Sequence, residues 1–225
     1  MTGERSRELG AVLGMYEREF PRGQRETRAS VRRWLHAKAA GRLEPNDYHI
    51  LVATARGDGR VAAFAFFHYL ADINSGFLGY MAVRRTLRNH GIGRWLFGQV
   101  KLRLGEDATQ RGFGVPEGVF MELEVEDATP EVDARLRFWQ RVDALPLRLQ
   151  WQYPRLQRGA APAEMYLAFC PMRGAGRRIP AERVRRAVVS IYRHVYGKGA
   201  DDPNLFHVLD SIGTVAYVGR AHRGR

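Results

Sequence analysis

The spacing of apolar residues predicts two amphipathic helices at the start of the chain. In both, apolar side chains recur at the three- and four-residue intervals that place them on one helix face. The stripes are Leu9, Val12, Leu13, Tyr16 and Phe20, followed by Val31, Trp34 and Leu35. Pro21 and Gly23 end the first helix, and Gly41 ends the second.

Three strands are predicted next. Apolar runs over residues 48–55 and 60–70 flank Gly57-Asp58-Gly59, which is typical of a β-hairpin. A third run, residues 77–83, predicts a buried strand, and a basic turn leads from it into a helix over residues 93–104. The strands therefore form an antiparallel meander that a helix follows.

The next segment returns the chain to the same sheet. The apolar run at residues 119–125 predicts a strand parallel to residues 77–83, because a helix connects the two. Pro130 begins a further helix, and residues 147–153 and 164–169 read as two final strands. The fold class is α/β (α+β), with a mixed, mostly antiparallel sheet flanked by helices.

Residues 171–225 form a predicted C-terminal helical extension to a domain at residues 1–170. Pro180 begins one helix of the extension, and Asp202-Pro203 caps and begins another. Both helices carry apolar stripes, which must be buried either on the domain or on a partner subunit, so a homodimer is one of the two alternatives.

Composition indicates a globular protein. The chain has 225 residues, of which 45% are hydrophobic and 11% aromatic, enough for a substantial core. It has no apolar run of the roughly 18 residues that a membrane span requires, and no apolar signal core at the N-terminus. Cys170 is the only cysteine, which excludes an intrachain disulfide and a cysteine-based zinc site. We expect a cytoplasmic protein with no membrane partner.

A net charge of +12 raises the alternative of a nucleic-acid-binding protein. Residues 171–225 hold 11 Lys and Arg against 4 Asp and Glu, which is +7 of the total. However, positive potential also attracts a small, multiply anionic ligand. Nucleic acid is therefore the less favoured partner.

The turn after residues 77–83 has the features of an anion site. It reads Arg88-x-x-Gly91-x-Gly93 and leads directly into a helix. The first backbone N–H groups of a helix have no internal partner and attract negative charge. Glycines let a phosphate approach this backbone closely, and Arg88 adds a forked donor. The chain has no Gly-Lys-Ser/Thr of a P-loop and no dinucleotide-binding glycine pattern.

Together with its flanks, this motif resembles the coenzyme A signature of the GNAT acyltransferases. The resemblance runs from Met81-Ala82-Val83 through Arg88-x-x-Gly91-Ile92-Gly93 to Leu96, and the order of predicted elements over residues 5–170 matches the GNAT layout. It implies a GNAT-like fold, acetyl-CoA as cofactor and two splayed strands that admit the pantetheine arm. It also implies a set of cofactor-binding residues: Met81, Ala82, Val83, Arg88, Asn89, His90, Gly91, Ile92, Gly93 and Arg94.

Two carboxylates on one predicted strand are candidate catalytic bases. Glu122 and Glu124 lie two residues apart and so share a strand face, where an unpaired carboxylate is costly. Leu123-Glu124-Val125 also resembles the Leu-Glu-Val of the N-terminal alanine acetyltransferase branch, whose glutamate acts as base. We therefore favour Glu124, with Glu122 second. The alternative is that this face is solvated or paired with arginine.

The tyrosine that many GNAT enzymes use as general acid has no counterpart here, because Phe138-Trp139 occupies its place. Tyr166 is the candidate substitute that we retain; Tyr153, Tyr80 and water are the alternatives. No grouping of His, Asp and Glu has metal-ligand spacing, so we predict no metal.

The resemblance implies transfer of an acetyl group from acetyl-CoA to an amine of a small molecule or polypeptide. Three charged residues lie in loops that line the acceptor site in GNAT folds, and they are candidate substrate-binding residues: Glu19, Arg25 and Asp72. Two alternatives stay open, a catalytically weak acyl-CoA-binding module and a basic nucleic-acid-binding protein.

Overall fold

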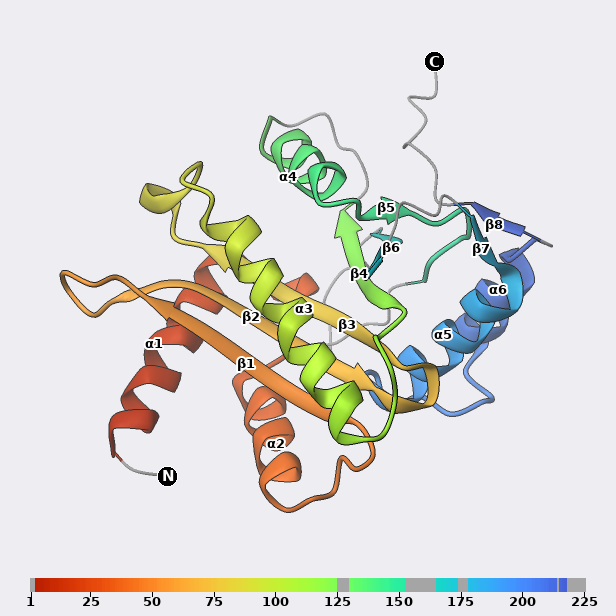
Figure 1. Ribbon diagram of the computed structural model, residues 1–225, viewed down its shortest axis with the longest axis horizontal. Helices are drawn as coiled ribbons and strands as arrows, with labels where there is room; N and C mark the ends of the chain where they lie inside the picture. Colours follow the sequence, from red (N-terminus) through yellow and green to blue (C-terminus); the bar gives the residue numbers. More distant parts are fainter. Residues whose placement is uncertain (1–2, 125–129, 153–164, 174–177, 214, 218–225) are drawn as a thin grey trace.

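The computed structural model describes residues 3–124, 130–152, 165–173, 178–213 and 215–217. A six-stranded sheet in the order β1-β2-β3-β4-β6-β5 forms its centre (Figure 1). The strands are β1 (Asp47–Thr54), β2 (Val61–Leu70), β3 (Ser75–Val83), β4 (Gly118–Glu124), β5 (Leu145–Pro146) and β6 (Met165–Pro171). β3 and β4 are parallel, and the other neighbours are antiparallel. The predicted fold class and the parallel pairing are confirmed.

Helices cover both faces of this sheet. They are α1 (Gly3–Glu19), α2 (Arg28–Ala39), α3 (Ile92–Gln110), α4 (Pro130–Arg141), α5 (Ala181–His194) and α6 (Pro203–Ser211). α3 and α4 contribute to the core on one face, and α1 and α2 to the core on the other (Figure 1). Within the described part of the chain, every helix is too short or too polar to cross a bilayer.

The alternation of side chains along β2 explains the two layers. Phe64 and Phe66 point into the core shared with α1 and α2, whereas Ala63 and Ala65 face α3. All ten residues of β2 are buried, as expected of a central strand covered on both faces.

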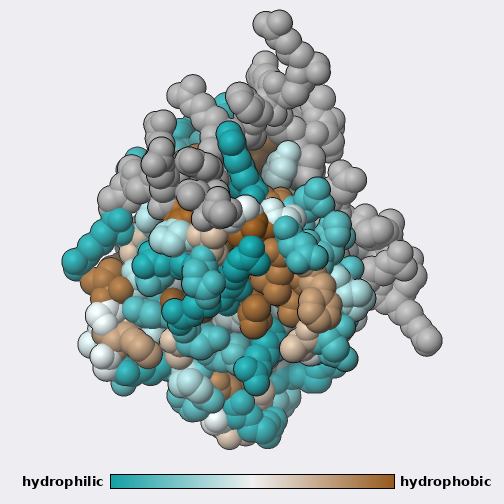
Figure 2. All heavy atoms as spheres, turned by 90° about the vertical axis from the view of Figure 1, so that its right-hand side faces the viewer, coloured by the Kyte–Doolittle hydropathy of each residue, from teal (hydrophilic) through white to brown (hydrophobic). Residues whose placement is uncertain are grey.

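α5 and α6 pack on the same sheet face as α1 and α2, over its other half. Val188 and Ile191 of α5 share a core with Phe77 of β3 and Phe120 of β4. The apolar stripe of α5 is therefore buried within this chain. Figure 2 shows this side of the molecule, where hydrophilic side chains surround smaller apolar areas.

One prediction from the apolar pattern was wrong, and one pair of strands was missed. The run at residues 147–153 is not a strand: Leu147 N–H donates to Leu167 C=O, and the chain then turns as Leu149 N–H donates to Leu147 C=O. Beyond Leu147, the apolar side chains of Leu149 and Trp151 pack into the core that contains α5 instead of joining the sheet; residue 153 lies outside the described residues. A second small sheet of β7 (Arg178–Pro180) and β8 (Val215–Tyr217) was not predicted.

Candidate functional site

The parallel strands β3 and β4 separate halfway along β3. Their pairing ends at Leu78, opposite Met121, while β4 continues beside β6 as far as Glu124. Gly79 sits at a β-bulge in the pairing with β2, where such irregularities bend a strand away from its neighbour. The remainder of β3 therefore borders a gap, which we call the β3–β4 gap. Met81, Ala82 and Val83 follow the bulge along this edge, so the expected splay of these strands is present.

The turn after β3 leads into α3 in the way that the glycine pattern predicts. Asn89 and Gly91 adopt positive φ values of 66° and 77°, and Gly91 is the N-cap residue of α3. No side chain caps this helix. Because the N–H groups of the first turn, from Ile92 onward, have no partner inside a helix, they are available to an anion.

The basic side chains of this turn make defined contacts. Arg88 Nη2 lies 2.6 Å from Glu19 Oε2, and its Nε donates to Val83 C=O at 3.1 Å. His90 Nδ1 donates to Arg88 C=O at 2.7 Å. Glu19 therefore ties the turn to the end of α1.

Glu122 of β4 is held beside the gap by two hydrogen bonds. Its Oε1 accepts hydrogen bonds from Trp151 Nε1, at 2.6 Å, and from the Tyr196 hydroxyl. Burial raises the pKa of Glu122 to about 7, although the two hydrogen bonds act in the opposite direction because they favour the ionised form. A carboxyl group that titrates near neutrality is suited to accept a proton.

Glu124 and Tyr166 occupy different surroundings. Glu124 lies at the end of β4, half-buried, and forms an ion pair with Arg135 of α4. Tyr166 of β6 packs against the core beneath α3 and α4, the sheet face opposite to the core that contains α5. The surroundings of Glu124 and Tyr166 thus differ from those of Glu122. Of the other candidate acids, Tyr80 does lie near Glu122, and Tyr153 is outside the described residues.

The three candidate acceptor residues are engaged in contacts between elements. Glu19 pairs with Arg88, as described above. Arg25 Nε donates to Phe20 C=O at 3.0 Å, and its Nη1 lies 3.7 Å from Glu17. Asp72 Oδ1 accepts from Ser190 of α5 at 2.7 Å. These side chains fasten loops and helices together, and none of them lines the pocket described next.

A small pocket lies beside the gap, between the half of the sheet covered by α1 and α2 and the half covered by α5. Its volume is about 30 Å³. We call it the β3–β4 pocket, and its described lining residues are Glu26, Tyr48, Phe66, His68, Phe77, Gly79, Tyr80, Glu122, Val195 and Tyr196. Burial lowers the pKa of His68 to about 3, so its imidazole is neutral at pH 7. Burial raises the pKa of Glu26 above its ordinary value.

A larger groove of about 1180 Å³ runs along the outer face of α3. It begins at Gly91 and carries the exposed apolar side chains of Trp95 and Leu102. Its carboxylate, Glu106, is exposed and forms an ion pair with Arg103 of the same helix. The groove therefore borders the start of α3, but it lacks a buried ionisable group of the kind found in the β3–β4 pocket.

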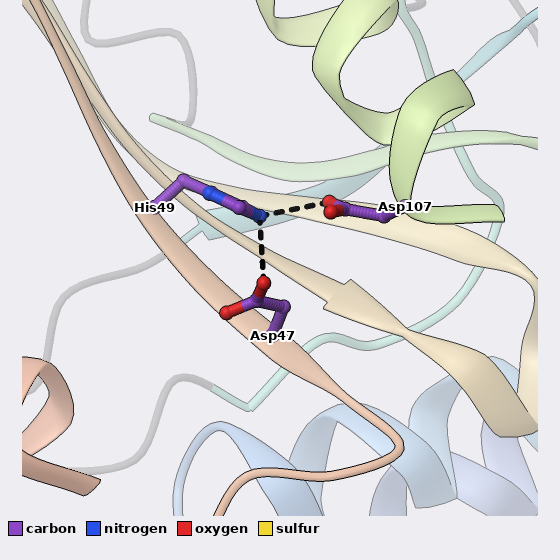
Figure 3. Close-up of side chains that lie close together, drawn as sticks. All are labelled: Asp47, His49 and Asp107. Atoms are coloured by element: carbon purple, nitrogen blue, oxygen red, sulfur yellow. Dashed lines mark hydrogen bonds and ion pairs between the residues drawn. The ribbon is translucent and has the colours of Figure 1, made fainter. Parts of the chain in front are cut away.

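Asp47, His49 and Asp107 form a further polar cluster, between β1 and α3 (Figure 3). His49 Nε2 lies 2.8 Å from Asp107 Oδ2 and 3.4 Å from Asp47 Oδ2. Three cations already balance the two carboxylates: Lys38 lies 2.8 Å from Asp47, and Arg103 and Arg111 lie 3.5 and 3.9 Å from Asp107. We interpret the cluster as an ionic link between α2, β1 and α3, because a divalent metal ion there would face these fixed positive charges.

We expect Asp107→Asn to lower the free energy of unfolding by about 3 kcal/mol, because it removes the charge partner of buried groups. Glu106→Gln, one residue earlier in an exposed pair, should change it by less than about 0.5 kcal/mol. Urea unfolding of both variants measures the difference. Equal effects, or a higher melting temperature on adding Zn²⁺ or Mg²⁺, would contradict the interpretation of the cluster as an ionic link.

Sequence reasoning did not connect Trp151 or Tyr196 with Glu122, and it did not single out Glu26. Trp151 and Tyr196 contact Glu122 from segments that were interpreted as a strand and as an added helix, and Glu26 follows Arg25 in the first loop. One feature of the sequence could have pointed to Tyr196: it follows a strongly amphipathic helix and lies next to the apolar stripe of that helix. No local pattern connects it with Glu122, which is 74 residues away.

Comparison with known proteins finds a matching family and similar structures. The family model described as the acetyltransferase (GNAT) family matches residues 11–128. A protein from Bacteroides thetaiotaomicron assigned to the GNAT family has a similar structure, with a TM-score of 0.63 at 15% identity over 88% of this chain and 97% of that chain. NAA60 of Arabidopsis thaliana, solved with acetyl-CoA, has a TM-score of 0.50 at 14% identity over 74% of this chain and 94% of its own. No curated protein matches the chain.

Proposed function

Since this chain belongs to the GNAT family of acetyltransferases, we propose that it transfers the acetyl group of acetyl-CoA to an amine, with Glu122 as general base. One observation carries the proposal: the β3–β4 gap has the uncapped start of α3 at one end and a buried carboxyl group with a pKa of about 7 beside it. Acetyl transfer from a phosphate-bearing thioester requires an anion site and a proton acceptor close to the same gap.

The cofactor would follow the free edge of β3. The backbone of Met81, Ala82 and Val83 offers hydrogen-bonding groups along the gap, as a strand does to an added strand. The turn and first helical residues from Arg88 to Arg94 would hold the pyrophosphate through backbone N–H groups. Arg88 is placed to exchange its ion pair with Glu19 for a phosphate oxygen.

The reaction then needs few protein groups. The amine nitrogen attacks the thioester carbonyl carbon, which forms the C–N bond, and Glu122 accepts the proton that the nitrogen loses. A backbone N–H of Met81 or Ala82 is the candidate donor to the tetrahedral oxyanion. The C–S bond breaks when the intermediate collapses, and the coenzyme A thiolate takes up a proton. We assign the base to Glu122 and not to Glu124, because Glu124 is paired with Arg135.

Tyr196 is a positioning residue in this proposal. We expect Tyr196→Phe to move the acidic limb of the pH profile of kcat/KM to higher pH, because the carboxylate of Glu122 loses a hydrogen bond that lowers its pKa. Activity on the high-pH plateau should be largely kept. Tyr192→Phe is the matched control, since this neighbouring phenol donates to Gln152 C=O. An unmoved limb in Tyr196→Phe would contradict the role.

The proposal as a whole is tested by two measurements on the wild-type protein. Calorimetric titration should show micromolar binding of acetyl-CoA, and an assay of thiol release should show turnover with at least one amine of a panel that includes alkylamines, aminoglycosides and peptides. Binding without turnover of any amine would support the alternative of an acyl-CoA-binding module. Absence of binding would overturn the cofactor assignment.

A further inference from the structure

The charge inside the β3–β4 pocket is opposite to that of the whole protein. The chain carries a net charge of +12, yet the described residues that line this pocket include no lysine or arginine. Its ionisable groups include two carboxyl groups, Glu26 and Glu122, and an imidazole, His68, that stays neutral. A pocket with this lining attracts a cation.

One polar atom of a residue that lines the pocket lacks a partner among the described residues. The hydroxyl of Tyr48 is buried and makes no hydrogen bond with any described residue, and Tyr48 as a whole is only 2% exposed. An unpaired buried hydroxyl is costly, so its presence here indicates a ligand that hydrogen-bonds to it. Glu26, on the same pocket, is oriented by the indole of Trp34, whose Nε1 donates to Glu26 Oε1 at 3.2 Å.

The remaining walls are mainly aromatic, and the space is small. Rings of Tyr48, Phe66, Phe77, Tyr80 and Tyr196 line the pocket, and aromatic faces attract cations. The pocket volume of about 30 Å³ is small. A small pocket favours a compact cation such as a primary ammonium group over a guanidinium or a quaternary ammonium ion.

We propose that the β3–β4 pocket binds the primary ammonium group of an unbranched alkylamine, with Glu26 and Tyr48 as its recognition residues. The inference rests on the proposed function and deepens it, because it names the acceptor class. A primary ammonium group supplies three N–H donors, enough for Glu26, Glu122 and the Tyr48 hydroxyl together. An α-amino group carries a branch at the adjacent carbon, which a small pocket disfavours.

Two of the four tryptophans report on this pocket. The indole N–H of Trp34 donates to Glu26 and that of Trp151 donates to Glu122, whereas Trp95 and Trp139 lie on α3 and α4. We would titrate n-propylammonium chloride into ¹⁵N-labelled protein, with and without coenzyme A, and follow the four indole N–H resonances. Saturable shifts confined to the Trp34 and Trp151 resonances are expected. Sodium chloride and tetramethylammonium chloride should produce neither shift.

Variants separate recognition from stability. Glu26→Gln should weaken propylammonium binding by about 10-fold or more, whereas Glu17→Gln, on the surface of α1, should leave it unchanged. Tyr48→Phe removes a hydroxyl without a partner, so the fold should be as stable as before while ammonium binding weakens. Absence of saturable shifts, equal shifts with tetramethylammonium, or unchanged binding in both pocket variants would overturn the proposal.

A transfer assay distinguishes this proposal from the proposed function. Propylammonium that shifts both indole resonances but is never acetylated would leave the recognition site standing and overturn the acetyl transfer. Acetylation of n-propylamine by the Glu26→Gln variant with an unchanged KM would overturn the recognition site and leave the acetyl transfer standing. Support for both requires that n-butylamine is acetylated with a kcat/KM about 10-fold or more above that of its branched isomer 2-aminobutane.

Discussion

Replacing Glu122 by glutamine is expected to lower kcat by about 10²- to 10³-fold, within the usual contribution of a positioned general base. Glutamine keeps the shape of the side chain and can still accept hydrogen bonds from Trp151 and Tyr196, but it cannot take a proton from the amine. The affinity for acetyl-CoA should be unchanged, because we place the phosphates at the far end of the gap. Steady-state kinetics and calorimetry measure the two quantities.

The pH profile adds a second criterion. Because burial raises the pKa of Glu122 to about 7, the wild-type rate should increase as pH rises through 7 and level off above it. This limb should be absent from the residual activity of Glu122→Gln. Glu124→Gln is the matched control: it lies on the same face of β4, but its partner is Arg135, so its kcat should fall by no more than a few-fold. A larger loss in Glu124→Gln than in Glu122→Gln would restore Glu124 as the base.

Replacing Gly91 by glutamate is expected to weaken acetyl-CoA binding by about 100-fold or more. The substitution puts a carboxylate at the start of α3, where we place the pyrophosphate, and like charges in contact cost several kcal/mol. A Cβ at Gly91 meets no atom within 4 Å, so steric conflict within the protein does not account for the loss. Isothermal titration calorimetry measures the dissociation constant.

Gly91 also has a positive φ of 77°, and any side chain strains such a backbone. Gly112→Glu controls for this strain, because Gly112 follows the other end of α3 with a φ of 74° and equally open space. Both variants should lose similar stability in thermal unfolding, but only Gly91→Glu should lose affinity for acetyl-CoA. Loss of affinity in both variants would indicate that strain, not charge, is responsible.

Local patterns in the sequence were sufficient to predict the fold. Capping side chains next to the first turn specified the helix starts. Thr27 accepts a hydrogen bond from Ser30 N–H, and Asp202 accepts one from Asn204 N–H. The hairpin turn and the turn before α3 depended on glycines. In contrast, Leu147 and Trp151 are buried in the core that contains α5, and a period-based interpretation does not distinguish that burial from burial within a sheet.

The candidate site was predicted only in part, for a physical reason. The glycine turn is contiguous in the sequence, so its place at the start of α3 followed from the motif. Glu122 and Glu124 share a strand face, and nothing local to them shows that one meets Trp151 and Tyr196 while the other meets Arg135. The partners that set the pKa of Glu122 arrive from 29 and 74 residues away. Ranking the two carboxylates therefore required the tertiary structure.

The contact between Tyr196 and Glu122 also bears on how the protein matures during synthesis. During synthesis, the N-terminal residues leave the ribosome first. Here the first 124 residues include both strands of the gap and the glycine turn, yet the wall formed by Val195 and Tyr196 cannot exist until the ribosome has added those residues. A nascent chain would therefore contain the proposed cofactor-binding segments well before the proposed acceptor pocket closes.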